Sequence, residues 1–207
     1  MKTTVDWAHS LGISVDATPA EIGDYSELCP RSAREIAIRA LILQGVVAVA
    51  HGVDADAIIE WFKGEGIWDN VSADELAFLR SEQHSDEQRI KFTWHVEAEW
   101  TLLWAVGKVE SLGLPVNTCD TRRLVDEIIP ALGSTISEFL VSAEHRSPGI
   151  LLAEDDRTYN LWCYLVAARR MNSGIPEDLN QSVLYERRYA FEWLAGVQEW
   201  DEVSCDA

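Results

Sequence analysis

The sequence predicts an all-α protein folded as one irregular, orthogonal helical bundle of about eight helices. Serine followed three residues later by glutamate or glutamine recurs ahead of stretches with helical apolar spacing, and this pair is the capping box that opens helices. Glycine or proline closes most of those stretches. No run alternates apolar and polar residues over strand length, although "LGISV" at residues 11–15 could form a brief extended piece.

Residues 1–30 differ from the rest of the chain. They lack helical periodicity, and two glycines and two prolines interrupt them. We expect an irregular N-terminal segment, with short turns or one short helix, packed on the body. Residues 31–207 show neither a repeat period nor a low-complexity linker, so they predict a single helical domain.

The first long helix is predicted to begin at the capping box of Ser32 and Glu35 and to stop at Gly52. A helix that is hydrophobic nearly all round must be central in the fold. The interior of this helix is apolar except for Arg39, Gln44 and Gly45.

Later helices carry similar signals. Capping boxes begin at Ser72 and Ser85, Pro148 suits the first position of a helix, and Pro115 is a predicted helix end. Together these signals predict helices over residues 54–62, 72 to about 80, 85–115, 121–129, about 134–144, 149 to about 171, and 180 to about 197.

The charge balance restricts the classes of partner. The chain has 17 Lys and Arg against 35 Asp and Glu, a formal net charge of −18. Nucleic acid is excluded as a partner because its binding depends on cationic side chains that displace phosphate counterions, and anionic membrane surfaces are disfavoured likewise. The acidity serves solubility, or it steers the chain toward a basic protein partner.

Cysteine usage and apolar run lengths indicate the compartment. The four cysteines are dispersed, with no Cys-x-x-Cys pair and no histidines at zinc spacing, so we expect free thiols, a reducing compartment and no metal or other cofactor. The N-terminus lacks the apolar core of a signal peptide, and no apolar run approaches the ~20 residues that span a bilayer. We expect a cytoplasmic protein, and leave its oligomeric state open.

Nine tryptophans are unusual for a chain of 207 residues. Trp100 and Trp104 lie four residues apart with Trp94 nearby, which places them on one face of a helix. We interpret them as core packing. The alternative is an aromatic ligand pocket, which would require convergent polar groups.

Charged residues interrupt the apolar stripes of four predicted helices. Arg39 and Arg187 stand on two of them, Glu97 on a third, and Asp155 and Asp156 on a fourth. A buried charge is costly unless it is paired, and a guanidinium can satisfy a carboxylate through two parallel hydrogen bonds. We therefore predict that Arg187 pairs with Glu97 or one of the aspartates across a helix interface. The alternative is an anion-binding or catalytic pocket built from the same groups.

Other charged pairs carry less weight. Arg188 and Glu192, four residues apart, predict an exposed ion pair. His95 and Glu99 have the same spacing and could offer two metal ligands, but no third ligand is evident. The sequence contains no nucleophile elbow, phosphate-binding loop or dinucleotide fingerprint, which favours a protein that is not an enzyme without deciding the point.

Five blocks resemble a bacterial family of domains of unknown function, DUF4272. They are "RSAREIAIRALIL", "WHVEAEWTLLWAVG", "DRTYNLWCYLVAAR", "YERRYAFEWL" and "WDEVSCDA". The double arginine followed by Trp200 and Asp201 is the most specific element. The resemblance implies no activity. At His95, where the family pattern tends to arginine, the chain departs from it, which implies one cation fewer near Glu97; it departs again at Ala207, where the family tends to threonine.

The resemblance also implies which charged residues belong to a common pattern: Arg34, Arg39, Glu97, Asp156, Glu186, Arg187, Arg188 and Asp201. Combined with the stripe argument, it gives a candidate polar-core cluster of Arg39, Glu97, Asp156, Glu186, Arg187 and Asp201. Our leading hypothesis is an acidic, non-enzymatic module that binds a basic protein, for example as a neutralising partner of a toxin. The alternative is an enzyme or small-anion binder that uses the polar cluster.

Overall fold

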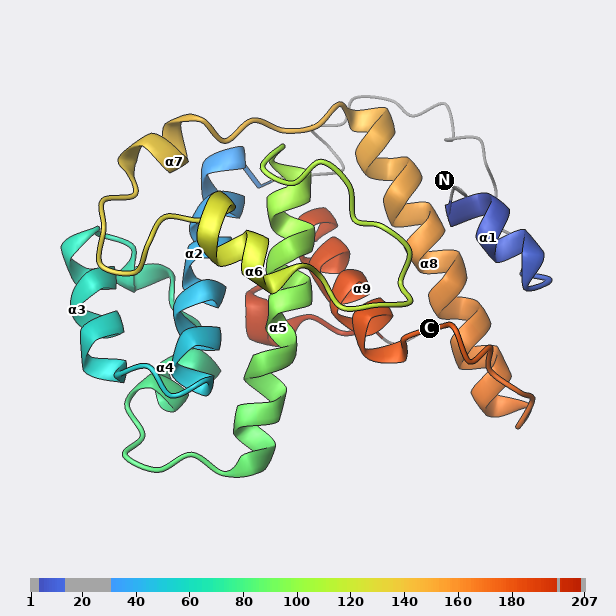
Figure 1. The fold of residues 1–207 in the computed structure, drawn as a ribbon, viewed down its shortest axis with the longest axis horizontal. Helices are drawn as coiled ribbons and strands as arrows, with labels where there is room; N and C mark the ends of the chain where they lie inside the picture. The colour runs from blue at the N-terminus through green and yellow to red at the C-terminus, as the bar shows by residue number, and fades with distance from the viewer. Residues whose placement is uncertain (1–3, 14–30, 197, 206–207) are drawn as a thin grey trace.

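The computed structural model describes residues 4–13, 31–196 and 198–205, and these residues contain helices and no strand (Figure 1). The predicted all-α class is therefore confirmed. The helices are α1 (Thr4–Ser10), α2 (Ala33–Ala50), α3 (Ala55–Gly64), α4 (Ala73–Leu79), α5 (Asp86–Ala105), α6 (Thr121–Arg123), α7 (Ser137–Val141), α8 (Pro148–Arg170) and α9 (Gln181–Ala195). Shorter helical turns are η2 (Trp68–Asn70), η3 (Leu124–Ile128), which continues α6, and η4 (Trp200–Glu202).

Helices α2 and α5 form the centre of the molecule, where they lie side by side (Figure 1). α2 is buried along almost its whole length, as its apolar composition predicts. Gly45 allows α3 to approach closely, because a Cβ atom at this position would overlap the ring of Phe62. α5 also packs against α9, so this helix connects the two halves of the core.

Helices α8 and α9 pack together, and α1 lies on α8 (Figure 1). Trp7 and Ile13 from the N-terminal segment join Leu161 and Leu165 of α8 in a second apolar cluster. α1 is thus one short helix packed on the body. Residues 14–30, together with the second part of "LGISV", lie outside the described residues.

The helix starts agree with the capping signals in the sequence. α2, α4 and α5 each begin at a reciprocal capping box, in which the serine hydroxyl and the glutamate or glutamine side chain accept each other's backbone N–H groups. α9 begins at Asn180, whose Oδ1 accepts the N–H groups of Ser182 and Val183 at 3.1 and 3.2 Å. These local signals fix the starts of the helices that build the candidate site.

α5 ends at Ala105, well before the predicted end at Pro115. Gly107 adopts a φ of +76°, which turns the chain out of the helix. The Arg146 side chain caps this end of the helix, because its Nε donates to the carbonyl of Trp104 at 2.6 Å. Residues 106–120 consequently form a loop.

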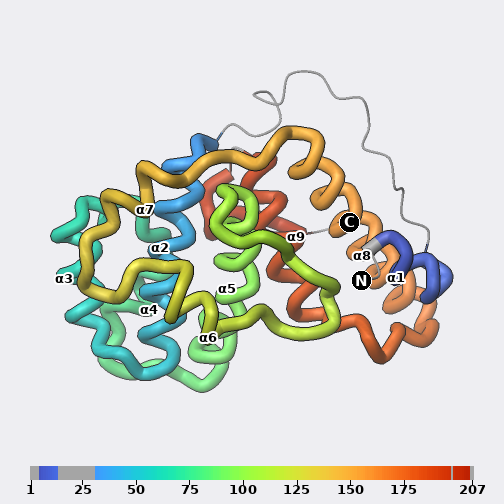
Figure 2. Tube along the Cα trace, turned by 45° about the horizontal axis from the view of Figure 1, so that its top comes forward, coloured from blue at the N-terminus to red at the C-terminus, as the bar shows by residue number. Residues whose placement is uncertain are grey.

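That loop, residues 106–120, passes beside α9 before the chain returns to α6 (Figure 2). Near α9 the N–H of Asn180 donates to the carbonyl of Pro115 at 2.8 Å. α7 is also shorter than the predicted 134–144. The N–H of Ile136 donates to the carboxylate of Glu65, the residue that follows α3, at 3.1 Å, and this contact holds the chain ahead of α7 against the end of α3.

The tryptophans belong mainly to the core. Seven of the nine are buried, while Trp68 and Trp94 are half-buried. Within the described part of the chain, no helix combines the length and the apolarity required to cross a membrane.

Candidate functional site

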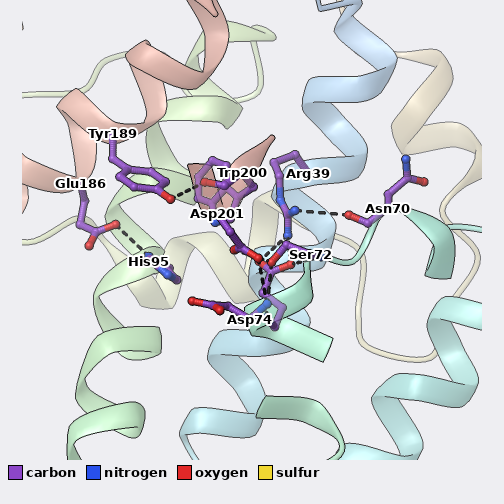
Figure 3. Close-up of polar contacts among 10 residues, drawn as sticks. Arg39, Asn70, Ser72, Asp74, His95, Glu186, Tyr189, Trp200 and Asp201 are labelled. Carbon is purple, nitrogen blue, oxygen red and sulfur yellow. Dashed lines mark hydrogen bonds and ion pairs between the residues drawn. The ribbon is translucent and has the colours of Figure 1, made fainter. Parts of the chain in front are cut away.

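Trp200 anchors the C-terminal segment to the bundle. Its side chain is buried between Tyr189 of α9 and Arg39 of α2 (Figure 3). The Tyr189 ring lies edge-on at 4.9 Å between centroids, and its hydroxyl donates to the Trp200 carbonyl. The Arg39 guanidinium lies 5.0 Å from the centre of the indole. Aromatic and cation–π contacts therefore hold Trp200 from both sides.

Asp201 fastens the same segment to the start of α4. Its Oδ1 accepts the Ser72 hydroxyl at 2.7 Å, and its Oδ2 accepts the backbone N–H of Asp74 at 2.8 Å. A carboxylate is favoured here because the first N–H groups of a helix lack intrahelical partners and carry partial positive charge. Lys91 of α5 forms an ion pair with Asp74 at 2.8 Å, so α4, α5 and the C-terminal segment meet at this point.

Arg39 pairs with Glu75, a residue of the α4 capping box. One terminal nitrogen of Arg39 contacts both carboxylate oxygens of Glu75, at 2.5 Å for Oε2, and the other donates to the carbonyl of Asn70 at 3.3 Å. Both side chains are almost fully buried. Since Glu75 Oε2 also accepts the N–H of Ser72, one carboxylate completes the helix cap and neutralises the arginine.

His95 and Glu186 form a second buried pair close to Trp200. His95 Nδ1 lies 3.0 Å from Glu186 Oε2, and the two side chains point toward each other from α5 and α9 (Figure 3). Both are about nine-tenths buried or more. The Trp200 ring meets the His95 ring edge-on at 6.0 Å. The contact with Glu186 fixes the orientation of the imidazole, because a hydrogen bond at one ring nitrogen determines where the other nitrogen points.

A cavity of about 580 Å³ opens beside this pair, and we call it the Trp200 cavity. α5 and α9 form its walls, and α4, α8 and the C-terminal segment contribute to its edges. Its aromatic lining consists of Phe92, Trp94, Trp162, Tyr185, Tyr189 and Trp200. Its polar lining consists of Asp74, Lys91, His95, Arg169, Gln181, Ser182, Glu186 and Asp201.

Arg187 is buried, as its position on the α9 stripe predicts, but the predicted pairing with a carboxylate is wrong. Its terminal nitrogens donate to the carbonyls of Leu112 and Gly113 at 2.7 and 2.9 Å. The early end of α5 explains the difference, because the resulting loop brings its carbonyl groups to α9. Arg187 thus holds a loop rather than another helix.

Glu97 lies near Arg187 without direct contact. Its Oε1 accepts the backbone N–H of Cys119 at 2.6 Å, whereas its buried Oε2 has no hydrogen-bond partner among the described residues. Burial raises the pKa of Glu97, and the positive charge of Arg187 opposes that rise. Burial likewise lowers the pKa of Arg187, and Glu97 opposes that change. The two groups are coupled electrostatically through space.

The family departure at His95 does not remove a cation from Glu97. His95 faces Glu186, so the partner of position 95 is a different carboxylate. Glu99, fully buried on the same helix, lies beside Gln44 of α2, whose amide nitrogen, when turned toward the carboxyl group, donates to both oxygens at 2.9 and 3.2 Å. Burial raises the pKa of Glu99 well above its ordinary range, which favours the neutral acid.

The predicted cluster is divided in the structure. Arg39, Glu186 and Asp201 surround Trp200, whereas Glu97 and Arg187 lie at the loop 106–120. Asp156 is exposed on α8 and takes no part in either group. A cluster of all six residues therefore does not form.

The prediction that the pair of Arg188 and Glu192 is exposed is also wrong. The ion pair is present, but Arg188 is buried and bonds in addition to Asp155 Oδ1 at 2.8 Å. Two consecutive residues of α9 are therefore buried arginines with different partners. The helical spacing alone could not distinguish a surface pair from one covered by α8.

Several chemical roles lack support around these groups. Burial raises the pKa of the Cys119 thiol, with Glu97 adding to the effect, which disfavours a reactive thiolate. Burial also raises the pKa of Tyr189. Cys119 and Cys163 are free thiols, and Cys29 lies outside the described residues. Among the described residues, no group of three His, Cys, Asp or Glu side chains could hold a metal ion.

Sequence reasoning missed two residues that complete the site. Glu75 was recognised only as a capping residue, and its second role required knowledge that α4 packs on Arg39. Lys91 had no signal beyond its place on α5. His95 was noted through the family departure, which was a usable signal, although its partner Glu186 came from another helix.

The comparisons with known proteins give one match. The model of the family described as domain of unknown function, DUF4272, matches residues 1–203. Searches of curated proteins and of solved structures returned no match. A match over nearly the whole chain agrees with the resemblance of the five sequence blocks, and it includes the segment with Trp200 and Asp201. The chain therefore belongs to the DUF4272 family.

Proposed function

We propose that the protein binds a small, planar organic molecule in the Trp200 cavity. The observation that carries this proposal is an aromatic-lined cavity whose wall contains the buried pair of His95 and Glu186. Its volume of about 580 Å³ is that of a small-molecule site. Aromatic walls with a few convergent polar groups are the usual composition of such sites, since the rings supply contact area and the polar groups fix orientation.

The geometry favours a hydrogen-bonding ring over a small anion. The terminal nitrogens of Arg39 and Arg187 already donate to protein acceptors, so neither guanidinium is offered to an anion. Of the two basic residues that line the cavity, Lys91 is paired with Asp74, and Arg169 donates to Gln181 Oε1 at 2.7 Å. A flat heteroaromatic ring could stack on the wall formed by Tyr185 and Tyr189 while the His95–Glu186 pair contacts its polar edge.

Binding can be measured through the tryptophans of the cavity. Uracil, adenine, benzamidine and benzoate, which share a flat ring and differ in charge, would be titrated while tryptophan fluorescence and melting temperature are recorded. We expect saturable quenching and a rise in melting temperature with at least one of them, because a ligand that binds only the folded state stabilises it. Failure of all four at millimolar concentration would contradict the proposal.

A matched pair of variants locates the binding. Ser182 lines the cavity and is half-buried, so Ser182→Trp should fill the space and abolish binding, whereas Ser182→Ala should retain it. Glu186→Gln keeps a hydrogen bond to His95 but removes the charge, and it should weaken binding without abolishing it. Equal affinity in Ser182→Trp and the wild type would place the ligand elsewhere.

A second function, binding of a basic protein, is favoured by a different observation. The net charge of −18 coexists with exposed apolar side chains that gather at one groove. A toxin with a basic surface is one example of such a partner. Electrostatic steering would then raise the association rate, and this rate should fall markedly as salt rises beyond the ~0.1 M range, where charges are screened over about 10 Å.

A further inference from the structure

A groove separate from the Trp200 cavity runs between α2, α5 and η3. It has a volume of about 530 Å³, and none of its lining residues is Asp, Glu, Lys or Arg. Val47, Val96 and Leu124 contribute to its base and sides. Trp94 lines both the groove and the cavity, so α5 separates the two sites. The groove is therefore an apolar depression on an otherwise strongly acidic protein.

Three large apolar side chains at the groove are exposed. Val53, Val125 and Leu132 have exposed fractions of 40, 53 and 37 %. They come from three separate segments of the chain, so the fold, and not a single apolar segment of the sequence, brings them together. Exposed apolar residues that gather around a depression are typical of binding surfaces, whereas single ones are ordinary.

The charges beside the groove are predominantly negative. Asp54 and Asp56 lie one and three residues after Val53, and both are exposed. The two arginines near Val125 are engaged with neighbouring acids, at 3.4 Å between Arg122 and Asp126 and 3.6 Å between Arg123 and Glu127. The remaining charges near Val53 are the two aspartates and one arginine, Arg89, whose Nη1 donates to the carbonyl of Ala50 at 3.4 Å. The local balance is therefore negative, the same sign as the charge of the whole chain.

We propose that the groove between α2, α5 and η3 docks an amphipathic helix of a partner protein, with an apolar face in the groove and lysines or arginines along its flanks. A groove between helices accepts the apolar face of another helix, and the acidic surroundings select basic flanks. This inference rests on the second proposed function, binding of a basic protein, and is independent of the ligand in the Trp200 cavity.

The test uses a designed helical peptide with leucines on one face and lysines elsewhere, titrated into the full chain. We expect saturable binding that weakens as salt rises from ~0.05 to ~0.5 M. A second peptide with the same leucine face and glutamates in place of lysines should bind at least about tenfold more weakly. Equal binding of the two peptides would overturn the proposal.

Matched variants of the protein locate the peptide. The double substitution Val125→Ser and Leu132→Ser removes apolar surface without changing charge, and it should reduce affinity by about tenfold or more. Val141→Ser is the control, because Val141 is 83 % exposed and does not line the groove. Thermal melting of each variant verifies that it is folded.

The outcomes distinguish docking in the groove from attraction of the peptide to the acidic surface as a whole. Peptide binding that is salt-dependent but equal in the groove variant and the control would retain the acidic-surface function and overturn docking in the groove. No binding of the lysine peptide to the wild type would overturn both. A wild-type dimer that becomes a monomer in the groove variant would show that a second copy of the chain occupies the groove, and would also overturn the proposal.

Discussion

The buried arginines of α2 and α9 stand on similar apolar stripes, yet the protein satisfies them differently. Arg39 meets a carboxylate, Glu75, which also caps α4. Arg187 meets two backbone carbonyls of the loop 106–120, while the carboxylate of Glu97 acts on it only through space. In both arginines Nε has no partner among the described residues. The same residue type therefore joins two helices in one region and holds a loop in the other.

This difference has an energetic consequence. Removing one member of a buried ion pair leaves an uncompensated charge, whereas removing a donor from backbone carbonyls leaves only neutral acceptors, whose loss of a partner costs less. We therefore expect the Arg39 region to behave as part of the global fold. The Arg187 region should respond locally.

The largest effect is expected for Arg39→Met. Glu75 would remain buried without its cation, and the variant should lose about 3–5 kcal/mol of unfolding free energy in denaturant titrations. The double variant Arg39→Met with Glu75→Gln should recover much of that loss, since glutamine keeps the reach back to Ser72. A loss below about 1 kcal/mol in the single variant would show that water reaches this pair.

Arg187→Met should have a smaller and more local effect. Loss of two charge-assisted hydrogen bonds should cost about 2–3 kcal/mol, and hydrogen exchange should accelerate at the backbone N–H of Cys119 and of Asn180, which the loop protects. In a double-mutant cycle with Glu97→Gln, the coupling energy should be smaller than that between Arg39 and Glu75. A larger coupling would mean that Arg187 and Glu97 pair directly in solution.

Asp201→Ala tests the C-terminal attachment beside the Arg39 region. It removes both acceptors at the start of α4, which should cost about 1–2 kcal/mol. Because Trp200 is adjacent, its fluorescence should report a loosened segment before global unfolding. The neighbouring exposed residue offers a control, and Glu202→Ala should leave both stability and fluorescence unchanged.

The subtlest effect concerns pH and Glu99→Gln. Burial raises the pKa of Glu99 in the folded protein above its ordinary value of 4.5, so its contribution to stability is full below that value and is lost as the pH rises. The free energy of unfolding of the variant, relative to that of the wild type, should therefore increase between about pH 5 and 8 in denaturant titrations. A difference between the two proteins that stays constant with pH would indicate an unshifted carboxyl group.

Local signals predicted much of the fold because they depend on neighbours in the chain. The three capping boxes and Asn180 each act within three residues, and all are present. The end of α5 was predicted poorly, since Pro115 is a strong signal but Gly107 stops the helix first. The site was predicted in part: Arg39, Glu186 and Asp201 lie around Trp200, while Asp156 is exposed.

The sequence by itself determined the helices, the central position of α2 and the burial of Arg39 and Arg187, because periodicity and apolar content act over short distances along the chain. Only the tertiary structure decided the partners. Glu75 reaches Arg39 from a short helix, and carbonyls of a loop reach Arg187, because any nearby acceptor can satisfy a buried guanidinium. Which acceptor is nearby depends on the path of the loops between helices, and the spacing of residues in the sequence does not determine that path.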